Sequence, residues 1–256
     1  MIKNIEALLG RVTKEIREKT DVAVVGLSGG ADSTLVATLC VLALGKNNVY
    51  GVHMPYNDLD KRTFNARSRS LVKKLNINEE TVQINDAVEG LSKQFYALST
   101  LNHGNMRSRM RMVSLYTVAC NIGEEVGRRV RVVGTGNLSE DYIGYDTKGG
   151  DALTDFFPIG TLFKSEVYQL LEYFRDNGVI DEEHIDRVPS AGLWDGQTDE
   201  SELGYTYNEM EPAILRCLNG TKDLSNSLDK FVWERHLNNK HKHEAPAVID
   251  LSEFRE

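Results

Sequence analysis

The chain has 256 residues, 41% of them hydrophobic and 27% charged, a composition that excludes intrinsic disorder and fits one domain spanning residues 1–256. Its formal net charge of -8 argues against a broad surface for nucleic acid or anionic lipid, although local cations could still bind small anions. No apolar run approaches the roughly 20 residues that span a bilayer, and the start of the chain lacks the apolar core of a signal peptide, so we expect a cytoplasmic protein without a membrane partner.

Short β-branched runs alternate with segments of helical periodicity along the first half of the chain. We predict helices at residues 2–16, 32–45, 64–75 and 105–127. We predict strands at residues 21–27, 48–55, 80–85 and 129–136. Gly45 stops the second helix and Pro55 ends the second strand. Such alternation predicts right-handed crossovers and a mostly parallel sheet with helices on both faces.

The second half of the chain has a different texture. A connection rich in glycine and aspartate covers residues 137–160, which is too long for an ordinary loop between a strand and a helix. Its scattered aromatic and apolar residues favour an ordered, functional segment. Helices are predicted at 164–178, 206–218 and 225–239, before a basic stretch at 240–246. The predicted fold class is therefore α/β with a helical C-terminal part.

The sequence contains three cysteines, Cys40, Cys120 and Cys217. They form no C-x-x-C pair, so the sequence indicates neither a disulfide framework nor a zinc site. We expect all three to be buried as small hydrophobic side chains.

The stretch GLSGGADS, residues 26–33, follows the first predicted strand at its carboxyl end, where open α/β sheets bind their ligands. Its glycines let backbone amides approach an anion, Ser28 and Ser33 add hydroxyl donors, and the next helix points its positive end inward. The P-loop and dinucleotide motifs are both absent. A carboxylate, Asp32, takes the place of the P-loop lysine, and it would repel phosphates unless it held a divalent cation such as Mg²⁺.

The form S-G-G-x-D-S resembles the signature of the ATP pyrophosphatases, which activate a carbonyl or carboxyl oxygen as an adenylate and release pyrophosphate. Further stretches appear in the order expected of the NAD synthetase family, at residues 105–116, 134–151, 155–167, 189–207 and 240–246. The resemblance implies a Rossmann-like fold of the adenine nucleotide alpha hydrolase type. It also implies ATP-dependent amidation of nicotinic acid adenine dinucleotide (deamido-NAD) to NAD⁺ through an acyl adenylate.

The same resemblance bears on the nitrogen donor and the assembly. Glutamine-using relatives carry a large extra amidase domain, whereas only one short helix precedes the first strand here, so free ammonia is the expected donor. The expected partners are therefore ATP, deamido-NAD and ammonia, with Mg²⁺ as cofactor. Relatives act as homodimers with the long helix near the interface, and we expect a homodimer.

The resemblance further implies roles for individual residues. Asp32 and Glu140 match the two carboxylates that hold the metal, Lys164 matches a lysine that neutralises charge as pyrophosphate departs, and these three are the expected catalytic residues. The residues expected to bind ATP are Gly26, Leu27, Ser28, Gly29, Gly30, Ala31, Asp32, Ser33, Thr135, Lys164 and Ser190. The residues expected to bind deamido-NAD are Arg109, Lys148, Asp155, His241 and Lys242.

Helical spacing places Arg109 on an apolar stripe of the long helix, where a charged group needs a partner. The other members of that stripe are Met112, Val113, Tyr116 and Cys120. Arg107 and Arg111 fall off the stripe, and we interpret them either as solvated charges or as part of an arginine triplet that attracts a dinucleotide phosphate.

Two positions depart from the family's pattern. Ser190 stands where many relatives have threonine, and it keeps a hydroxyl. His53 ends the second strand where some relatives have arginine, and a lone histidine at a strand end is more often structural than catalytic.

Two other functions stay open. A tRNA-thiolating enzyme would share S-G-G-x-D-S but would need reactive cysteines and a basic surface, which this composition does not favour. A nucleotide-binding sensor would keep the fold without turnover, and the joint presence of Asp32, Glu140 and Lys164 argues against it.

Overall fold

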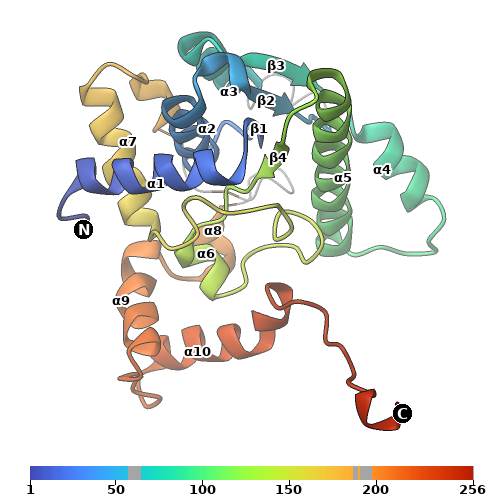
Figure 1. The fold of residues 1–256 in the computed structure, drawn as a ribbon. Helices are drawn as coiled ribbons and strands as arrows, with labels where there is room; N and C mark the ends of the chain where they lie inside the picture. The colour runs from blue at the N-terminus through green and yellow to red at the C-terminus, as the bar shows by residue number, and fades with distance from the viewer. Residues whose placement is uncertain (57–64, 187–189, 191–197, 256) are drawn as a thin grey trace.

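Four parallel strands form a sheet at the centre of the molecule (Figure 1). The computed structural model describes residues 1–56, 65–186, 190 and 198–255. The strands are β1 (Val22–Gly26), β2 (Val49–His53), β3 (Asn78–Thr81) and β4 (Val130–Val133), in the order β3-β2-β1-β4. β1 therefore pairs with β2 on one side and with β4 on the other, and the strand order changes direction there. In sheets of this kind the crevice beyond such a switch point is where ligands bind.

Helices cover both faces of the sheet (Figure 1). They are α1 (Ile5–Lys19), α2 (Ala31–Leu44), α3 (Asn65–Leu75), α4 (Asn85–Ser92), α5 (Thr100–Val126), α6 (Leu138–Tyr142), α7 (Lys164–Asp176), α8 (Asp199–Leu203), α9 (Tyr207–Leu218) and α10 (Ser227–Asn239). α1, α2, α3 and α7 share one hydrophobic core with the sheet, and α5 packs against the opposite face.

Successive side chains of β1 point to opposite faces of the sheet, so the strand contributes to the hydrophobic cores on both faces. Ala23 and Val25 join the core beneath α2, while Val22 and Val24 join the core beneath α5. All four side chains are buried, as expected for a strand covered on both faces. The predicted α/β class with a parallel sheet is thus confirmed. Among the described helices, none combines the length and apolar character needed to cross a bilayer.

β3 lies earlier in the chain than the strand predicted at 80–85. Its pairing with β2 ends where His53 meets Thr81, and α4 already begins at Asn85. β3 is an edge strand whose side chains are largely exposed, so it carries little apolar signal of its own. The apolar residues that suggested the strand lie beyond it: Val82 packs against the core beneath α5, and buried Ile84 is the N-cap of α4.

The cysteines are not all buried. Cys40 and Cys217 are buried, but Cys120 is exposed. Cys120 lies on α5 next to Ala119, and it is Ala119 that packs on the sheet. The expectation for Cys120 is therefore wrong, because the buried side of this helix is rotated from the predicted stripe.

The C-terminal part is helical, as predicted, and its helices build a separate core beside the sheet. Residues of α6, α8, α9 and α10 meet there, with Ile143, Met210, Ile214 and Val232 fully buried. Gly144 lets the loop after α6 touch α10, because a Cβ atom at this position would lie 2.1 Å from Cβ of Asn239.

Replacement of Gly144 by alanine tests this contact. Gly144 has φ +62, so Gly144→Ala adds left-handed strain as well as overpacking against Asn239, and we expect it to lower the free energy of unfolding by about 2–5 kcal/mol. Gly149→Ala is the matched control, since Gly149 has φ +69 with open space around the new Cβ, and strain alone should cost about 1–2 kcal/mol. Urea unfolding of both variants measures the difference, and equal losses would contradict the role of the contact.

Candidate active site

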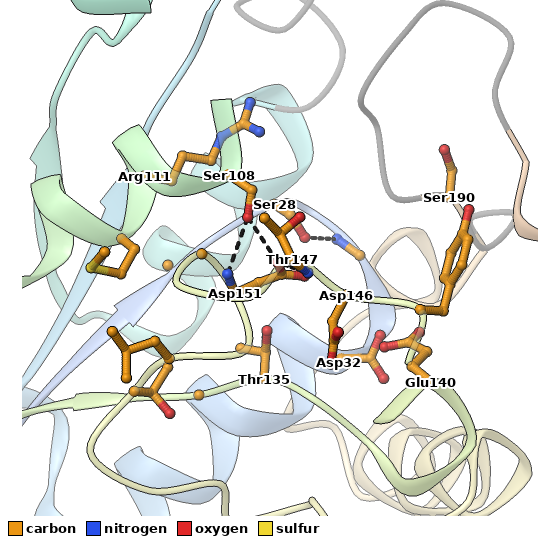
Figure 2. A pocket seen from close by; sticks show the side chains of 18 of the residues that line it. Ser28, Asp32, Ser108, Arg111, Thr135, Glu140, Asp146, Thr147, Asp151 and Ser190 are labelled. Carbon is orange, nitrogen blue, oxygen red and sulfur yellow. Dashed lines mark hydrogen bonds between the residues drawn. The ribbon is translucent and has the colours of Figure 1, made fainter. Parts of the chain in front are cut away.

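A cavity of about 540 Å³ opens beyond the carboxyl ends of β1, β2 and β4 (Figure 2). Its walls come from the loops after these strands and from α5, with α7 and α10 closing other sides. The polar residues labelled in Figure 2 are Ser28, Asp32, Ser108, Arg111, Thr135, Glu140, Asp146, Thr147, Asp151 and Ser190. The position at the switch point and the volume both suit a small organic ligand.

The glycine-rich loop forms the floor between β1 and α2. Gly29 has φ +71, a left-handed conformation that favours glycine and turns the backbone sharply. Ser28 Oγ accepts a hydrogen bond from Gly30 N at 3.2 Å and lies 3.2 Å from Ser33 Oγ. Gly30 is the N-cap of α2 and has no side chain to cap the first turn, so the positive end of the helix faces the cavity. This geometry is that of an anion site.

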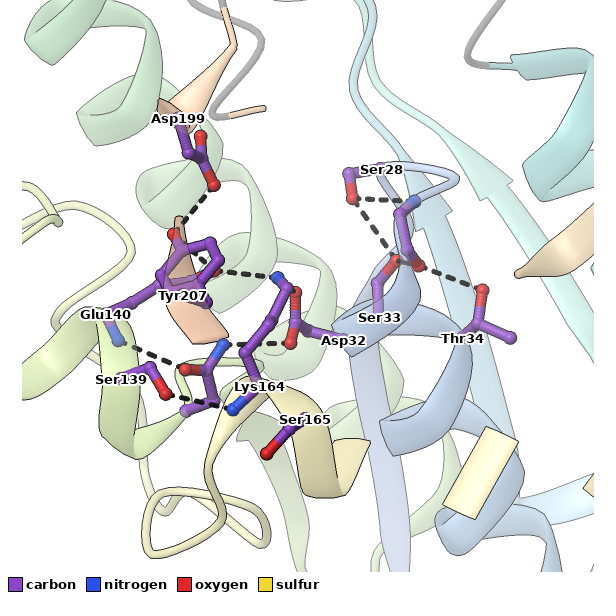
Figure 3. A network of polar contacts seen from close by, with 12 residues as sticks. Ser28, Asp32, Ser33, Thr34, Ser139, Glu140, Lys164, Ser165, Asp199 and Tyr207 are labelled. Carbon is purple, nitrogen blue, oxygen red and sulfur yellow. Dashed lines mark hydrogen bonds and ion pairs between the residues drawn. The ribbon is translucent and has the colours of Figure 1, made fainter. Parts of the chain in front are cut away.

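Three charged side chains from distant parts of the chain meet beside this loop (Figure 3). Lys164 Nζ lies 2.6 Å from Asp32 Oδ2 and 2.8 Å from Glu140 Oε1. Asp32 comes from the first turn of α2, Glu140 from α6 and Lys164 from the start of α7. Lys164 is only 4% exposed, and all three line the cavity. The three residues expected to be catalytic are thus brought together.

Burial and mutual attraction shift the pKa values within this group. Burial pushes the pKa of Glu140 above its ordinary value, although the Lys164 ammonium opposes the shift and favours the carboxylate. Burial alone would lower the pKa of Lys164, but the carboxylates of Asp32 and Glu140 outweigh it and raise that pKa above the ordinary value. Lys164 is therefore a fixed positive charge across the physiological pH range.

Hydrogen bonds from neighbouring segments hold the three charges in place. Asn137 donates from Nδ2 to Asp32 Oδ1 at 2.9 Å, and its Oδ1 accepts from Glu140 N at 3.1 Å, so one side chain links the two carboxylate-bearing helices. Ser139 Oγ accepts from the backbone N of Lys164 at 2.9 Å. The same hydroxyl donates to Glu211 Oε1 at 2.8 Å. The side chains of the group thus rest on a second set of polar contacts.

Glu211 and Tyr207 of α9 contact the charged group or its supports, and sequence reasoning missed both. Buried Glu211 also accepts from Ser165 N at 3.0 Å and from Ser165 Oγ at 2.5 Å, which fixes the first turn of α7. Tyr207 donates to buried Asp199 at 2.7 Å, and its hydroxyl lies 3.5 Å from Glu140 Oε1. Burial and the nearby carboxylates raise the pKa of Tyr207, so its hydroxyl stays a donor. No local pattern in the sequence marks either residue.

The residues expected to bind ATP lie around this centre. Gly26, Leu27, Ser28, Gly30, Ala31, Thr135 and Ser190 line the cavity together with the charged group. Gly29 and Ser33 are absent from the described lining and shape the loop from behind it. The stretch around Ser190 belongs largely to positions 187–189 and 191–197, which lie outside the described residues.

Four of the five residues expected to bind deamido-NAD lie side by side, and one of them, Lys242, lines the cavity. Arg109 Nε donates to the carbonyl of Lys148 at 3.2 Å, and Lys148 Nζ donates to the carbonyl of His241 at 2.6 Å. Lys242 lines the cavity, and its Nζ donates to the carbonyls of Gly144 and Asp146 at 2.7 and 2.8 Å. Three cations therefore collect where the loop after α6 meets the segment after α10.

Asp155 lies apart from this group. Its carboxylate accepts from Val132 N at 2.7 Å, and its own N–H donates to the Val132 carbonyl, so it extends the edge of β4. The residue is exposed and is not part of the described cavity lining.

The arginines of α5 are arranged differently from the predicted stripe. Arg109 and Val113 are exposed, whereas Arg111 is half-buried, lines the cavity and donates from Nε to the Met54 carbonyl at 3.2 Å. Arg107 stacks over the Tyr56 ring at 3.7 Å. The predicted apolar stripe containing Arg109 is therefore wrong, because the helix turns its Ser108 and Arg111 side toward the cavity. α5 packs on β1 and β4 through Ala119 and Ile122, and this packing fixes the rotation of the helix.

His53 is structural, as its place at a strand end suggested. Its side chain is fully buried and absent from the described cavity lining. Nδ1 lies 2.8 Å from Ser68 Oγ and Nε2 lies 3.1 Å from Glu79. Burial lowers the pKa of His53, which keeps the imidazole neutral between β2 and its neighbours.

Comparison with known proteins identifies the family. A family model described as NAD synthase matches residues 1–246. The NH3-dependent NAD⁺ synthetase of Methanosarcina acetivorans is 37% identical, over 97% of this chain and 99% of that protein. The enzyme of the same name from Fusobacterium nucleatum is 39% identical, over 80% of this chain and 76% of its own.

Solved structures agree with the sequence comparison. The structure of an NMN synthetase from Francisella tularensis superimposes with a TM-score of 0.79 at 30% identity, and it covers 98% of this chain and 100% of that one. Since the family model and a relative above 30% identity both span nearly the whole chain, this protein belongs to the NAD synthase family.

Proposed function

We propose that the protein is an ammonia-dependent NAD⁺ synthetase that converts deamido-NAD, ATP and ammonia into NAD⁺, AMP and pyrophosphate. The observation that carries the proposal is the meeting of Asp32, Glu140 and Lys164 beside a glycine-rich anion loop at the switch point of the sheet. Family membership gives the reaction its class.

The reaction needs no nucleophilic side chain. An oxygen of the nicotinate carboxylate attacks the α-phosphorus of ATP, the bond from that phosphorus to the bridging oxygen breaks, and pyrophosphate leaves with the electron pair. Ammonia then attacks the acyl carbon of the adenylate, AMP leaves, and the nitrogen loses a proton to give the amide. Catalysis rests on positioning two polyanions and on stabilising the charge of the departing group. The loop after β1 and Lys164 supply cationic and N–H groups for that purpose.

Asp32 and Glu140 fit a magnesium ion. Their oxygens already converge on one cation, the Lys164 ammonium, and hard carboxylate oxygens are the ligands that Mg²⁺ prefers. When bound with ATP, such an ion neutralises phosphate charge and orients the leaving group. We therefore assign the metal to these two residues and the departing phosphates to Lys164.

Lys148, Lys242 and Arg109 supply cations for the phosphates of deamido-NAD, with His241 beside them. Each of the three now donates to backbone carbonyls. A phosphate oxygen forms stronger, charge-assisted hydrogen bonds to the same donors. Arg111 on the cavity wall is a further cation that the sequence left unassigned.

The tRNA-thiolating alternative lacks support from the site. Among the described residues, no cysteine lines the cavity. Burial raises the pKa of Cys40 to about 12, so it is not a thiolate at neutral pH.

We further propose that the protein forms a homodimer with α5 at the interface. We also propose that it acts in the cytoplasm, where ATP is available. α5 exposes Leu101, Val113 and Val126 to 54%, 48% and 36%, although it also packs on the sheet. We assign these exposed apolar side chains to the dimer interface, where a second copy of the chain would bury them.

Carboxylate variants test the metal assignment. We expect Asp32→Asn and Glu140→Gln each to lower turnover by about 10²–10³-fold and to raise the Mg²⁺ concentration needed for half-maximal rate, because each removes one hard ligand. Glu172→Gln is the control, since Glu172 is an exposed acid on the same helix as Lys164. Pyrophosphate release is the measurement, and full activity of the first two variants would refute the assignment.

Parallel assays test the nitrogen donor and the acceptor. With ATP, Mg²⁺ and deamido-NAD, we expect ammonium to support equal formation of AMP and NAD⁺, while glutamine supports neither, because every catalytic group found among the described residues serves adenylation. Nicotinic acid mononucleotide is run beside deamido-NAD, since one structural relative is an NMN synthetase. If only nicotinic acid mononucleotide gives product, it replaces deamido-NAD as the proposed acceptor. If neither acceptor gives AMP, the proposed reaction is wrong.

Substitution on α5 tests the dimer. We expect Val113→Asp to shift sedimentation toward the monomer, because a charge placed in an apolar interface is desolvated without a partner. Val248→Asp is the control, because Val248 is 91% exposed in the C-terminal tail. If both variants sediment like the wild type, α5 is not the interface.

A further inference from the structure

We propose that Lys164 occupies the divalent-cation site in the nucleotide-free protein, so that metal enters only together with ATP, whose phosphates take over the ammonium group. This inference rests on the proposed function, because it assigns the metal to Asp32 and Glu140. It adds an order of binding that neither the family nor the fold specifies.

The distances carry the first step. Lys164 Nζ lies 2.6 Å from one carboxylate and 2.8 Å from the other, so the ammonium sits in the gap that a shared metal ion would occupy. Mg²⁺ binds its oxygen ligands at about 2.0–2.1 Å, which requires the same oxygens to point at the metal. The ammonium and the metal therefore compete for one position.

Charge carries the second step. One ammonium between Asp32 and Glu140 compensates much of their repulsion in a place where Lys164 is 4% exposed. A metal ion that bound while the ammonium stayed in place would bring two cations close together. A metal ion that displaced the ammonium in the absence of ATP would leave the buried charge of Lys164 without a partner. The polyphosphate of ATP removes both difficulties, because it supplies anionic oxygens for the ammonium and for the metal at once.

The structure also lets the side chain move while its backbone stays fixed. Lys164 N donates to Ser139 Oγ, and Glu211 holds the next residue, so the start of α7 is anchored. The side chain lines the cavity beside the glycine-rich loop, where phosphates would lie. Its Nζ lies 5.5 Å from the centre of the Tyr207 ring, an aromatic wall that leaves the cavity side as its exit. A rotation of the side chain is enough to exchange carboxylates for phosphates.

Manganese binding to the full-length protein tests the proposal without turnover. Mn²⁺ serves as the probe, and the signal of free Mn²⁺ in electron paramagnetic resonance reports binding. Without nucleotide, we expect Lys164→Met to bind Mn²⁺ at least about tenfold more tightly than the wild type, while Lys164→Arg stays weak because it keeps the cation. Adding a non-hydrolysable ATP analogue should tighten Mn²⁺ binding to the wild type by a larger factor than binding to Lys164→Met.

Controls separate this inference from misfolding and from the proposed function. Thermal unfolding with and without Mn²⁺ shows whether Lys164→Met folds, and Lys164→Gln serves as a second neutral variant. Adding Asp32→Asn to Lys164→Met should abolish the gained binding, which locates it at this site. Equal Mn²⁺ affinity of wild type and both neutral variants without nucleotide would overturn the inference. If the neutral variants gain Mn²⁺ binding as expected but the wild-type protein makes no NAD⁺ from deamido-NAD, ATP and ammonium, the proposed function alone is refuted.

Discussion

The buried ion pairs of Lys164 with Asp32 and Glu140 are the interaction on which fold and site both depend. They join the starts of α2 and α7 and the short helix α6, although Asp32 and Lys164 are 132 residues apart in the sequence. A buried ammonium without partners would cost about 3–5 kcal/mol, so these helices must meet for Lys164 to be tolerated. The contact that stabilises the junction is thus also the contact that positions the two carboxylates.

The helical C-terminal part supports this junction from one side. Glu211 on α9 holds the first turn of α7 through Ser165 and reaches the backbone of Lys164 through Ser139. Tyr207 on the same helix approaches Glu140. The separate core of α6, α8, α9 and α10 therefore contributes to the site, because its packing fixes the positions of Glu140 and Lys164 beyond the carboxyl ends of the strands.

Lys148 and Lys242 are also held by oxygen atoms from distant segments, but most of these are neutral backbone carbonyls, which bind an ammonium less strongly than carboxylates do. Lys148 and Lys242 donate to carbonyl oxygens of the segments they connect, and Lys242 Nζ also lies 3.5 Å from the Asp146 carboxylate, so these contacts join the loop after α6 to the segment after α10. Neutral carbonyls orient an ammonium but bind it less strongly than a phosphate does. The site is in this way preorganised for anions at both of its ends.

The sequence by itself determined the layered α/β fold, since β1, β2, β4 and the long helices follow from hydrophobic period, and the motifs pointed to Asp32, Glu140 and Lys164. It misplaced β3, whose exposed edge position gives almost no apolar pattern, and it chose the wrong stripe on α5. Only the tertiary structure selected Arg111 as a cavity residue and showed the support by Glu211 and Tyr207. Period and motif are local properties, whereas the rotation of a helix and the partner of a buried charge depend on side chains far away in the chain.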